Sequence, residues 1–125
     1  MFNIVSILIR FFINSFINPQ RKEMIMVKAA ILVRLEAKPG KEKEVEDFLN
    51  SGLEIVQGEP ETITWYAVSF GKSSFAIFDT FPGENGRNAH LNGKVAKALM
   101  AKAADLFSNE IVIEKADILA SKLAE

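Results

Sequence analysis

Asp79 and His90 are the residues best suited to acid–base chemistry. Asp79 lies within an aromatic run, and His90 follows that run. His90 is the only histidine among 125 residues, and the chain has no cysteine. Because an unperturbed imidazole titrates near ~6.5, His90 can move a proton near neutral pH. Asp79 alternates with apolar residues, so its carboxylate needs a partner. That partner is Arg34 on a neighbouring strand, His90, or a substrate hydroxyl.

Aromatic and polar residues near this pair are candidates for lining a binding pocket. Trp65 and Tyr66 are adjacent on a predicted strand and point to opposite faces, so one can line a cavity while the other packs at a sheet interface. Core packing is the competing interpretation for both. The full set of candidates is His90 and Asp79 for catalysis, and Trp65, Tyr66, Phe81, Arg34, Arg87 and Asn88 for substrate binding. The competing interpretations are a backbone hydrogen bond or loop cap for His90 and solvent-facing helix positions for Arg87 and Asn88.

Residue counts exclude several classes of function. Lys and Arg number 15 against 16 Asp and Glu, a formal net charge of −1, so the field that attracts a phosphate backbone is missing and no nucleic acid partner is expected. Without cysteine and with one histidine, a single chain cannot build a thiolate or two-histidine metal site. No Walker loop, strand-linked GxGxxG or GxSxG elbow is present. We therefore expect one compact domain with no metal and no organic cofactor.

The first segment of the chain differs in character from the rest. Residues 2–17 are strongly apolar, with polar residues every three or four positions, which is an amphipathic helical pattern. The stretch is shorter than the ~20 residues that span a bilayer core and carries an arginine. It is either an interfacial membrane helix or the product of a start codon assigned too early, with Met24 or Met26 as the first residue. We favour the second, and expect membrane contact only if residues 1–18 are translated. The predicted division is an extension at 1–25 and a folded domain at 26–125.

Hydrophobic periodicity predicts an alternating order of strands and helices after this extension. Alternation predicts strands, and apolar residues at helical spacing opposite a charged face predict helices. Gly93 is a plausible break within the second helical stretch. The predicted elements are a strand at 27–37, a helix from beyond Pro39-Gly40 to before Gly58, strands at 62–70 and 74–81 joined by a short turn, one or two abutting helices at 86–107, and a strand at 111–116. This order is the ferredoxin-like βαββαβ plan, an α+β fold with an antiparallel sheet.

The two hairpin strands lack a clean polar face. Trp65 and Ala67 alternate with Tyr66 and Val68, so both faces of the sheet need cover. Helices of this length can cover only one face. The second face is therefore expected to meet another copy of the chain, which predicts a homodimer.

The element order and two local motifs resemble the antibiotic biosynthesis monooxygenase family, including its proposed quinol monooxygenases. The motifs are residues 35–42, Leu-Glu-Ala-Lys-Pro-Gly-Lys-Glu, and Phe-Asp-Thr-Phe at 78–81 followed by Ala-His-Leu at 89–91. The likeness covers roughly four-fifths of the chain, from Met26 onward. It implies a dimeric α/β barrel in which two sheets pack face to face. It also implies oxidation of phenolic or quinol-like aromatics by O2 without metal or flavin.

A branch of the same superfamily degrades haem, and this chain departs from that pattern. In that branch the strand before the histidine typically ends in tryptophan, and an asparagine lies on the first strand. Here Phe81 stands at the tryptophan-like place, and Val33 and Arg34 occupy the first strand. Haem binding through His90 stays an outside alternative.

These observations lead to two main hypotheses of different classes. The first is a cytoplasmic, cofactor-independent monooxygenase in which His90 acts as the base that makes an electron-rich phenolate from a small aromatic substrate. The gap between a phenol near ~10 and an imidazole near ~6.5 is about 5 kcal/mol, which nearby donors or cations must offset. The second is a non-catalytic dimeric module that binds a small apolar ligand or a partner protein in the same cavity.

Overall fold

The computed structural model describes residues 26–124. They fall into two compact units, of which Val27–Leu119 contains all the described regular secondary structure, whereas residues 120–124 have none. The expectations for residues 1–25 lie outside the described residues. The elements are β1 (Ala29–Glu36), α3 (Glu42–Val56), β2 (Thr64–Gly71), β3 (Ser74–Phe81), α4 (Glu84–Leu91), α5 (Lys94–Leu106) and β4 (Ile113–Asp117).

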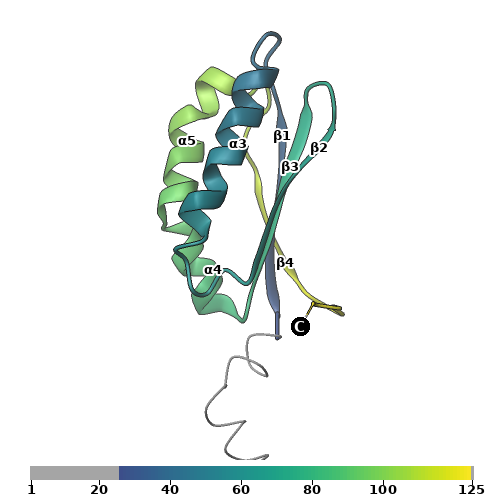
Figure 1. Ribbon diagram of the computed structural model, residues 1–125, viewed down its shortest axis with the longest axis vertical. Helices are drawn as coiled ribbons and strands as arrows, with labels where there is room; N and C mark the ends of the chain where they lie inside the picture. Colours follow the sequence, from purple (N-terminus) through teal and green to yellow (C-terminus); the bar gives the residue numbers. More distant parts are fainter. Residues whose placement is uncertain (1–25, 125) are drawn as a thin grey trace, which may run out of the picture. The chain divides into compact units, whose positions relative to one another are not determined.

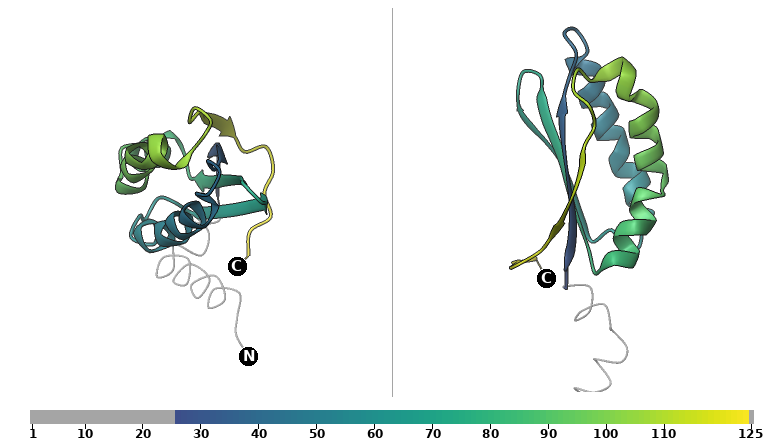
Figure 2. Two further views of the ribbon diagram at one scale, coloured as in Figure 1. Left: turned by 90° about the horizontal axis from the view of Figure 1, so that it is seen from above. Right: turned by 180° about the vertical axis from the view of Figure 1, so that it is seen from behind.

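The four strands form one antiparallel sheet in the order β2-β3-β1-β4. Among residues 26–124, the helices α3, α4 and α5 lie on the same face of this sheet, and none of them covers the other face (Figures 1 and 2). The predicted ferredoxin-like βαββαβ fold is therefore confirmed. No helix within residues 26–124 is both long and apolar enough to cross a membrane.

Helix α3 shows why the helices pack on this face. Its buried residues Val45, Leu49, Gly52 and Val56 recur at helical spacing and face the sheet, while charged residues cover the outer side. Acidic residues in its first turn also interact favourably with the positive end of the helix dipole. The core that results is shared by the inner face of the sheet, α3 and α5.

The second helical stretch is two helices. α4 ends at Leu91 and α5 begins at Lys94, so the break falls at the predicted Gly93. At this break the Gly93 amide donates to the His90 carbonyl at 2.9 Å. The last strand begins at Ile113, two residues later than predicted. The break therefore brings the end of α4 next to the start of α5.

The strand register decides which side chains face the helices. Asp79 on β3 lies opposite Ile31 of β1 and Trp65 of β2, and residues paired directly across antiparallel strands share a face. Ile31 belongs to the buried core, so Asp79 also projects from the helix-covered face. A carboxylate is thereby built into the apolar layer between sheet and helices.

The uncovered face of the sheet is apolar along β2. Tyr66 is 54% exposed, Val68 40% and Phe70 72%. Large apolar side chains gathered on one strand face usually mark a surface that another chain covers. For the described residues, the expectation that helices cover only one face is confirmed by the position of α3, α4 and α5.

Candidate functional site

His90 lies in the last turn of α4, pressed against the end of β3. The chain leaves β3 after Phe81 and turns back at once into α4, which brings the imidazole over the strand. The His90 and Phe81 ring centroids are 5.4 Å apart with an interplanar angle of 42°. Only 7% of His90 is exposed. The imidazole is therefore buried and held on one side by an aromatic ring.

Both ring nitrogens of His90 face carboxylates. The Nδ1 atom lies 2.6 Å from Glu59 Oε1, and the Nε2 atom lies 2.8 Å from Asp79 Oδ2. A neutral imidazole has one N–H donor, whereas an imidazolium has two. An imidazole between two carboxylates is thus best satisfied in its protonated, positively charged form.

The two buried partners shift each other's titration in a consistent way. Burial by itself lowers the pKa of His90, but the hydrogen bonds and charges of Asp79 and Glu59 outweigh it, so the pKa lies above the ordinary 6.5. Burial raises the pKa of Asp79 above its ordinary 3.8, and the nearby Glu59 charge adds to this, while His90 acts in the opposite direction. The pair formed by His90 and Asp79 therefore keeps its proton to a higher pH than an isolated histidine or aspartate does.

The contact between Asp79 and His90 is close but not ideally aligned. Neither carboxylate oxygen of Asp79 accepts a hydrogen bond of good geometry from the described residues, although Nε2 is within ion-pair distance. Asp79 is only 1% exposed, so water cannot freely replace the missing partner. Burial has the largest effect on this carboxyl group, so the pKa of Asp79 still rises although His90 lies beside it.

Glu59 is the member of this cluster that reaches the protein surface. It lies in the loop between α3 and β2, and its side chain is 21% exposed. The Thr62 hydroxyl donates to the same Oε1 atom at 2.7 Å, which fixes the carboxylate from the loop side. The contacts therefore run inward from Thr62 through Glu59 and His90 to Asp79. We call Glu59, His90 and Asp79 the carboxylate–imidazole cluster.

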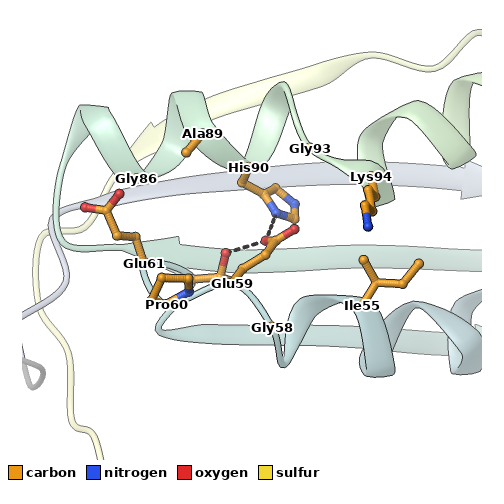
Figure 3. A pocket seen from close by; sticks show the side chains of 11 residues that line it. Ile55, Gly58, Glu59, Pro60, Glu61, Gly86, Ala89, His90, Gly93 and Lys94 are labelled. Atoms are coloured by element: carbon orange, nitrogen blue, oxygen red, sulfur yellow. Dashed lines mark hydrogen bonds and ion pairs between the residues drawn. The ribbon is translucent and has the colours of Figure 1, made fainter.

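A pocket of about 510 Å³ opens beside this cluster, between the loop after α3 and the α4–α5 break (Figure 3). Its wall contains two cluster members, Glu59 and His90, whereas Asp79 lies beneath them. Glu59, Glu61, His90 and Lys94 are the ionisable residues of the wall, and the rest are small or aliphatic. The lining residues are Ile55, Gly58, Glu59, Pro60, Glu61, Thr62, Gly86, Ala89, His90, Gly93 and Lys94.

Two glycines allow the loop to approach the helices this closely. A Cβ atom at Gly86 would lie 3.0 Å from Glu61 Cβ and 3.2 Å from the Glu61 carbonyl oxygen. A Cβ atom at Gly93 would lie 3.1 Å from the His90 carbonyl oxygen and 3.3 Å from Glu59 Oε2. A larger residue at Gly86 pushes the loop outward, whereas one at Gly93 meets the carbonyls at the end of α4 and the Glu59 carboxylate.

The predicted aromatic residues lie outside the pocket, two of them on the helix-covered face and one on the uncovered face. Trp65 packs on the helix-covered face, where its ring lies 3.2 Å from the Cβ position of Gly52, and its indole Nε1 is buried without a partner among the described residues. Tyr66 lies on the uncovered face, so the prediction of opposite faces is confirmed. Phe81 is fully buried against His90. None of the three lines the pocket.

The ion pair considered for Asp79 and Arg34 does not form. Arg34 lies opposite Ala76, whereas Asp79 lies opposite Ile31, so the two side chains project from opposite faces of the sheet. Arg34 instead pairs with Glu114 on β4, in an exposed position. The alternative partner, His90, is the one that Asp79 contacts.

Arg87 and Asn88 are also separated from the pocket. The expectation of a solvent-facing Arg87 is wrong, because the side chain is buried: Nη1 donates to the carbonyls of Ala30 at 3.2 Å and Ala116 at 2.9 Å, and Nη2 pairs with Glu84. These contacts link α4 to β1 and β4. Asn88 is exposed, as a helix-surface residue would be.

Glu59 is the site residue that the sequence did not reveal. It lies in an irregular loop, where no periodicity predicts which way a side chain points. The available signal was the short run Glu59-Pro60-Glu61-Thr62, a polar and rigid stretch directly after a helix end. That run marks a loop but does not indicate its partner, because His90 lies 31 residues further along the chain.

The described residues offer no evident metal site. Among residues 26–124, no group of three or more carboxylate and imidazole side chains is arranged to hold a metal ion. Haem ligation by His90 requires a ring nitrogen directed at an open space, but both nitrogens are within 2.8 Å of carboxylate oxygens. The arrangement fits proton exchange better than metal binding.

Comparison with solved structures finds similarity in sequence as well as in fold. A solved protein of unknown function from Nitrosomonas europaea is 51% identical, with 81% of this chain and 98% of that chain covered and a TM-score of 0.77. A proposed antibiotic biosynthesis monooxygenase from Bacteroides thetaiotaomicron is 19% identical, with 78% and 95% covered and a TM-score of 0.65. The corresponding Chloroflexus aurantiacus protein is 11% identical, with 76% and 96% covered and a TM-score of 0.60.

No protein-family model and no curated protein matches the chain. The two proposed monooxygenases are distant in sequence, so their likeness concerns the fold alone. This chain belongs to the same family as the Nitrosomonas europaea protein, and it has the fold of antibiotic biosynthesis monooxygenase-like proteins.

Proposed function

We propose that this protein is a cofactor-independent monooxygenase that oxidises a small quinol-type aromatic with O2 in the pocket beside Glu59. The observation that carries the proposal is the carboxylate–imidazole cluster at the wall of a pocket of about 510 Å³. Perturbed titratable groups that meet beside a pocket are typical of catalytic sites. The fold shared with proposed monooxygenases supports this class of chemistry.

In this proposal Glu59 takes the proton and His90 stabilises the resulting anion. His90 was expected to be the base, but both of its nitrogens already face carboxylates, and its raised pKa favours the imidazolium. Glu59 lines the pocket and has a partly exposed side chain. The substrate hydroxyl therefore gives its proton to Glu59, while Asp79 holds the positive imidazolium close by.

The energetics require the imidazolium. A carboxylic acid and a phenol differ by roughly 6 pKa units, so the proton transfer is uphill by about 8 kcal/mol. A positive charge about 4 Å from the new phenolate lowers this by about 4 kcal/mol at the effective dielectric constant of a partly buried site. The remaining cost of about 4 kcal/mol can be overcome because the oxidation step that follows consumes the anion irreversibly.

The substrate itself supplies all the electrons. A hydroquinone that reacts with O2 becomes a hydroxyquinone and water: one oxygen atom forms the new C–O bond, and the other leaves as water with two hydrogens of the substrate. The protein moves protons and orients the ring, and no further reductant is needed. This matches a site whose described groups are acids, an imidazole and an amine.

The test is O2 uptake with a panel of hydroquinones. We expect Glu59→Gln to lower kcat by roughly 100-fold or more, the usual contribution of a positioned general base. Glu54→Gln, an exposed glutamate on α3 outside the pocket, is the matched control and keeps the wild-type rate. Equal rates for Glu59→Gln and wild type would eliminate Glu59 as the proton acceptor.

The second candidate function is a non-catalytic module that binds a small ligand. It is favoured by the contacts of both His90 ring nitrogens with carboxylates, because ion-pair networks of this kind also occur in purely structural settings. A ligand-dependent rise in Tm without any O2 uptake would support this candidate over the monooxygenase.

We also propose that a second copy of the chain covers the open face of the sheet. The exposed Tyr66, Val68 and Phe70 support this, because they place apolar surface on the face that α3, α4 and α5 leave uncovered. Sedimentation tests it directly: a monomer at micromolar concentration contradicts the proposed assembly.

A further inference from the structure

Lys94 brings a positive charge to one end of the pocket. It is the first residue of α5, directly after the break that contains Gly93, and it lines the pocket. Figure 3 shows it at the opposite end from Glu61, with Glu59 and His90 between them. The pocket therefore has a cationic end, a proton-accepting middle and an anionic end.

The Lys94 ammonium has no carboxylate partner within the described part of the chain. Every ion pair found among residues 26–124 involves other cations, although two glutamates share the pocket wall with Lys94. A cation that lines a pocket and is left unpaired by its neighbours is available to a ligand. Lys94 is exposed, and so is Lys97, which also forms no ion pair among residues 26–124; Lys94 differs from it by its place in the pocket lining.

The start of α5 adds to this positive end. The helix has no acidic residue in its first turn, its N-cap is Gly93, and no side chain caps its free amides. The first turn of a helix carries unpaired N–H groups and partial positive charge. Lys94 and these amides lie at the same end of the pocket, so their effects on an anion add.

We propose that the substrate carries a carboxylate, which Lys94 binds while the aromatic hydroxyl of the same molecule meets Glu59. This inference rests on the proposed function and narrows its substrate class to acidic hydroxylated aromatics. Lys94 is a specificity-determining residue in this arrangement: it selects the anionic substituent and thereby orients the ring, whereas Glu59 and His90 act on the hydroxyl. An uncharged ring of the same shape lacks the contact with Lys94.

A matched pair of ligands tests the inference without turnover. Gentisate is a hydroquinone with a carboxylate, and gentisamide is its neutral amide. Binding is measured by calorimetry under anaerobic conditions, so that oxidation does not interfere. We expect gentisate to bind roughly twofold to fivefold more tightly than gentisamide, as for an ion pair with an exposed lysine, with the preference shrinking as salt is added.

Two lysine variants assign the preference to its residue. Lys94→Met keeps the aliphatic stem and is expected to bind both ligands with the weak affinity of the amide. Lys97→Met is the matched control, because Lys97 is exposed on the same helix and outside the pocket lining, and it keeps the preference for the acid. Equal binding of acid and amide to wild type, no binding of either, or a preference that survives in Lys94→Met would overturn the inference.

The outcomes separate this inference from the proposed function. A preference for gentisate that depends on Lys94, without any O2 uptake when oxygen is admitted, supports the binding role of Lys94 and rejects the monooxygenase. O2 uptake on neutral hydroquinones with no preference for the acid supports the monooxygenase and rejects the role of Lys94.

Discussion

Replacing His90 with glutamine is expected to leave the buried carboxylate of Asp79 without a cationic partner. Asp79 is 1% exposed, and the His90 Nε2 atom at 2.8 Å is the cation nearest to it among the contacts found. Removing one partner of a buried ion pair costs about 3–5 kcal/mol, because the other charge stays buried without compensation. We therefore expect His90→Gln to lower the free energy of unfolding by about 3–5 kcal/mol at about pH 8. Urea denaturation followed by circular dichroism gives this value directly.

A second variant separates the cost of the unpaired Asp79 charge from the cost of lost packing around residue 90. Asp79→Asn in the His90→Gln background removes the charge and leaves the shape nearly unchanged. The double variant should recover roughly 2 kcal/mol or more of the loss, a coupling typical of residues in contact. Single and double variants of equal stability would refute the reasoning, since the cost would then come from packing alone.

The pH dependence gives an independent check with a fixed sign. Burial raises the pKa of Asp79 in the folded state, and losing His90, which opposes that rise, raises it further. A group with a raised folded pKa contributes stability below its unfolded pKa and loses it as the pH rises through the folded value. His90→Gln should therefore gain stability relative to the double variant, which lacks this group, as the pH is lowered from about 8 toward the ordinary pKa of an aspartate. If the free energies of unfolding of the single and double variants change in parallel with pH, the raised pKa of Asp79 is contradicted.

Three further predictions address the surroundings of the site. Gly86→Ala should lower the free energy of unfolding by about 1–3 kcal/mol in urea titrations, because the new methyl meets backbone and side chain of Glu61, whereas Gly83→Ala, at a position with open space, should change it less. Arg87→Met should cost about 2 kcal/mol or more in the same assay, because two strand carbonyls lose a charged donor. Tyr66→Asp should shift the sedimentation coefficient toward that of a monomer while leaving the circular dichroism of the fold unchanged, since the side chain is already exposed.

The fold could be predicted from the sequence because its signals are local and agree with each other. The alternation in β1 and β3 and the helical spacing of Val45, Leu49 and Val56 each report burial within one element. Once the order of elements is known, few topologies satisfy it. Boundaries moved by one or two residues where turns compete with the pattern, as at the start of β4.

The partners within the site depend on register and loop conformation, which the sequence does not state. A shift of one residue between β1 and β3 would move Asp79 to the other face, so its pairing with Arg34 or with His90 was open until the register was known. Glu59 could not be assigned at all, because the contact depends on how the loop after α3 crosses Gly86 and Gly93. Conformations of this kind are set by long-range packing rather than by local preference.

The position of Glu59 changes what His90 can do. With Asp79 alone as its partner, His90 would have one nitrogen directed at the pocket and could serve as a base in the manner of a catalytic dyad. With Glu59 on the other nitrogen, the ring becomes a fixed positive charge, and the reactive carboxylate is placed at the pocket wall. His90→Gln and Glu59→Gln must then affect turnover for different reasons. The first loses stabilisation of the anion and is partly rescued by substrates with more acidic hydroxyls, whereas the second loses the proton acceptor itself.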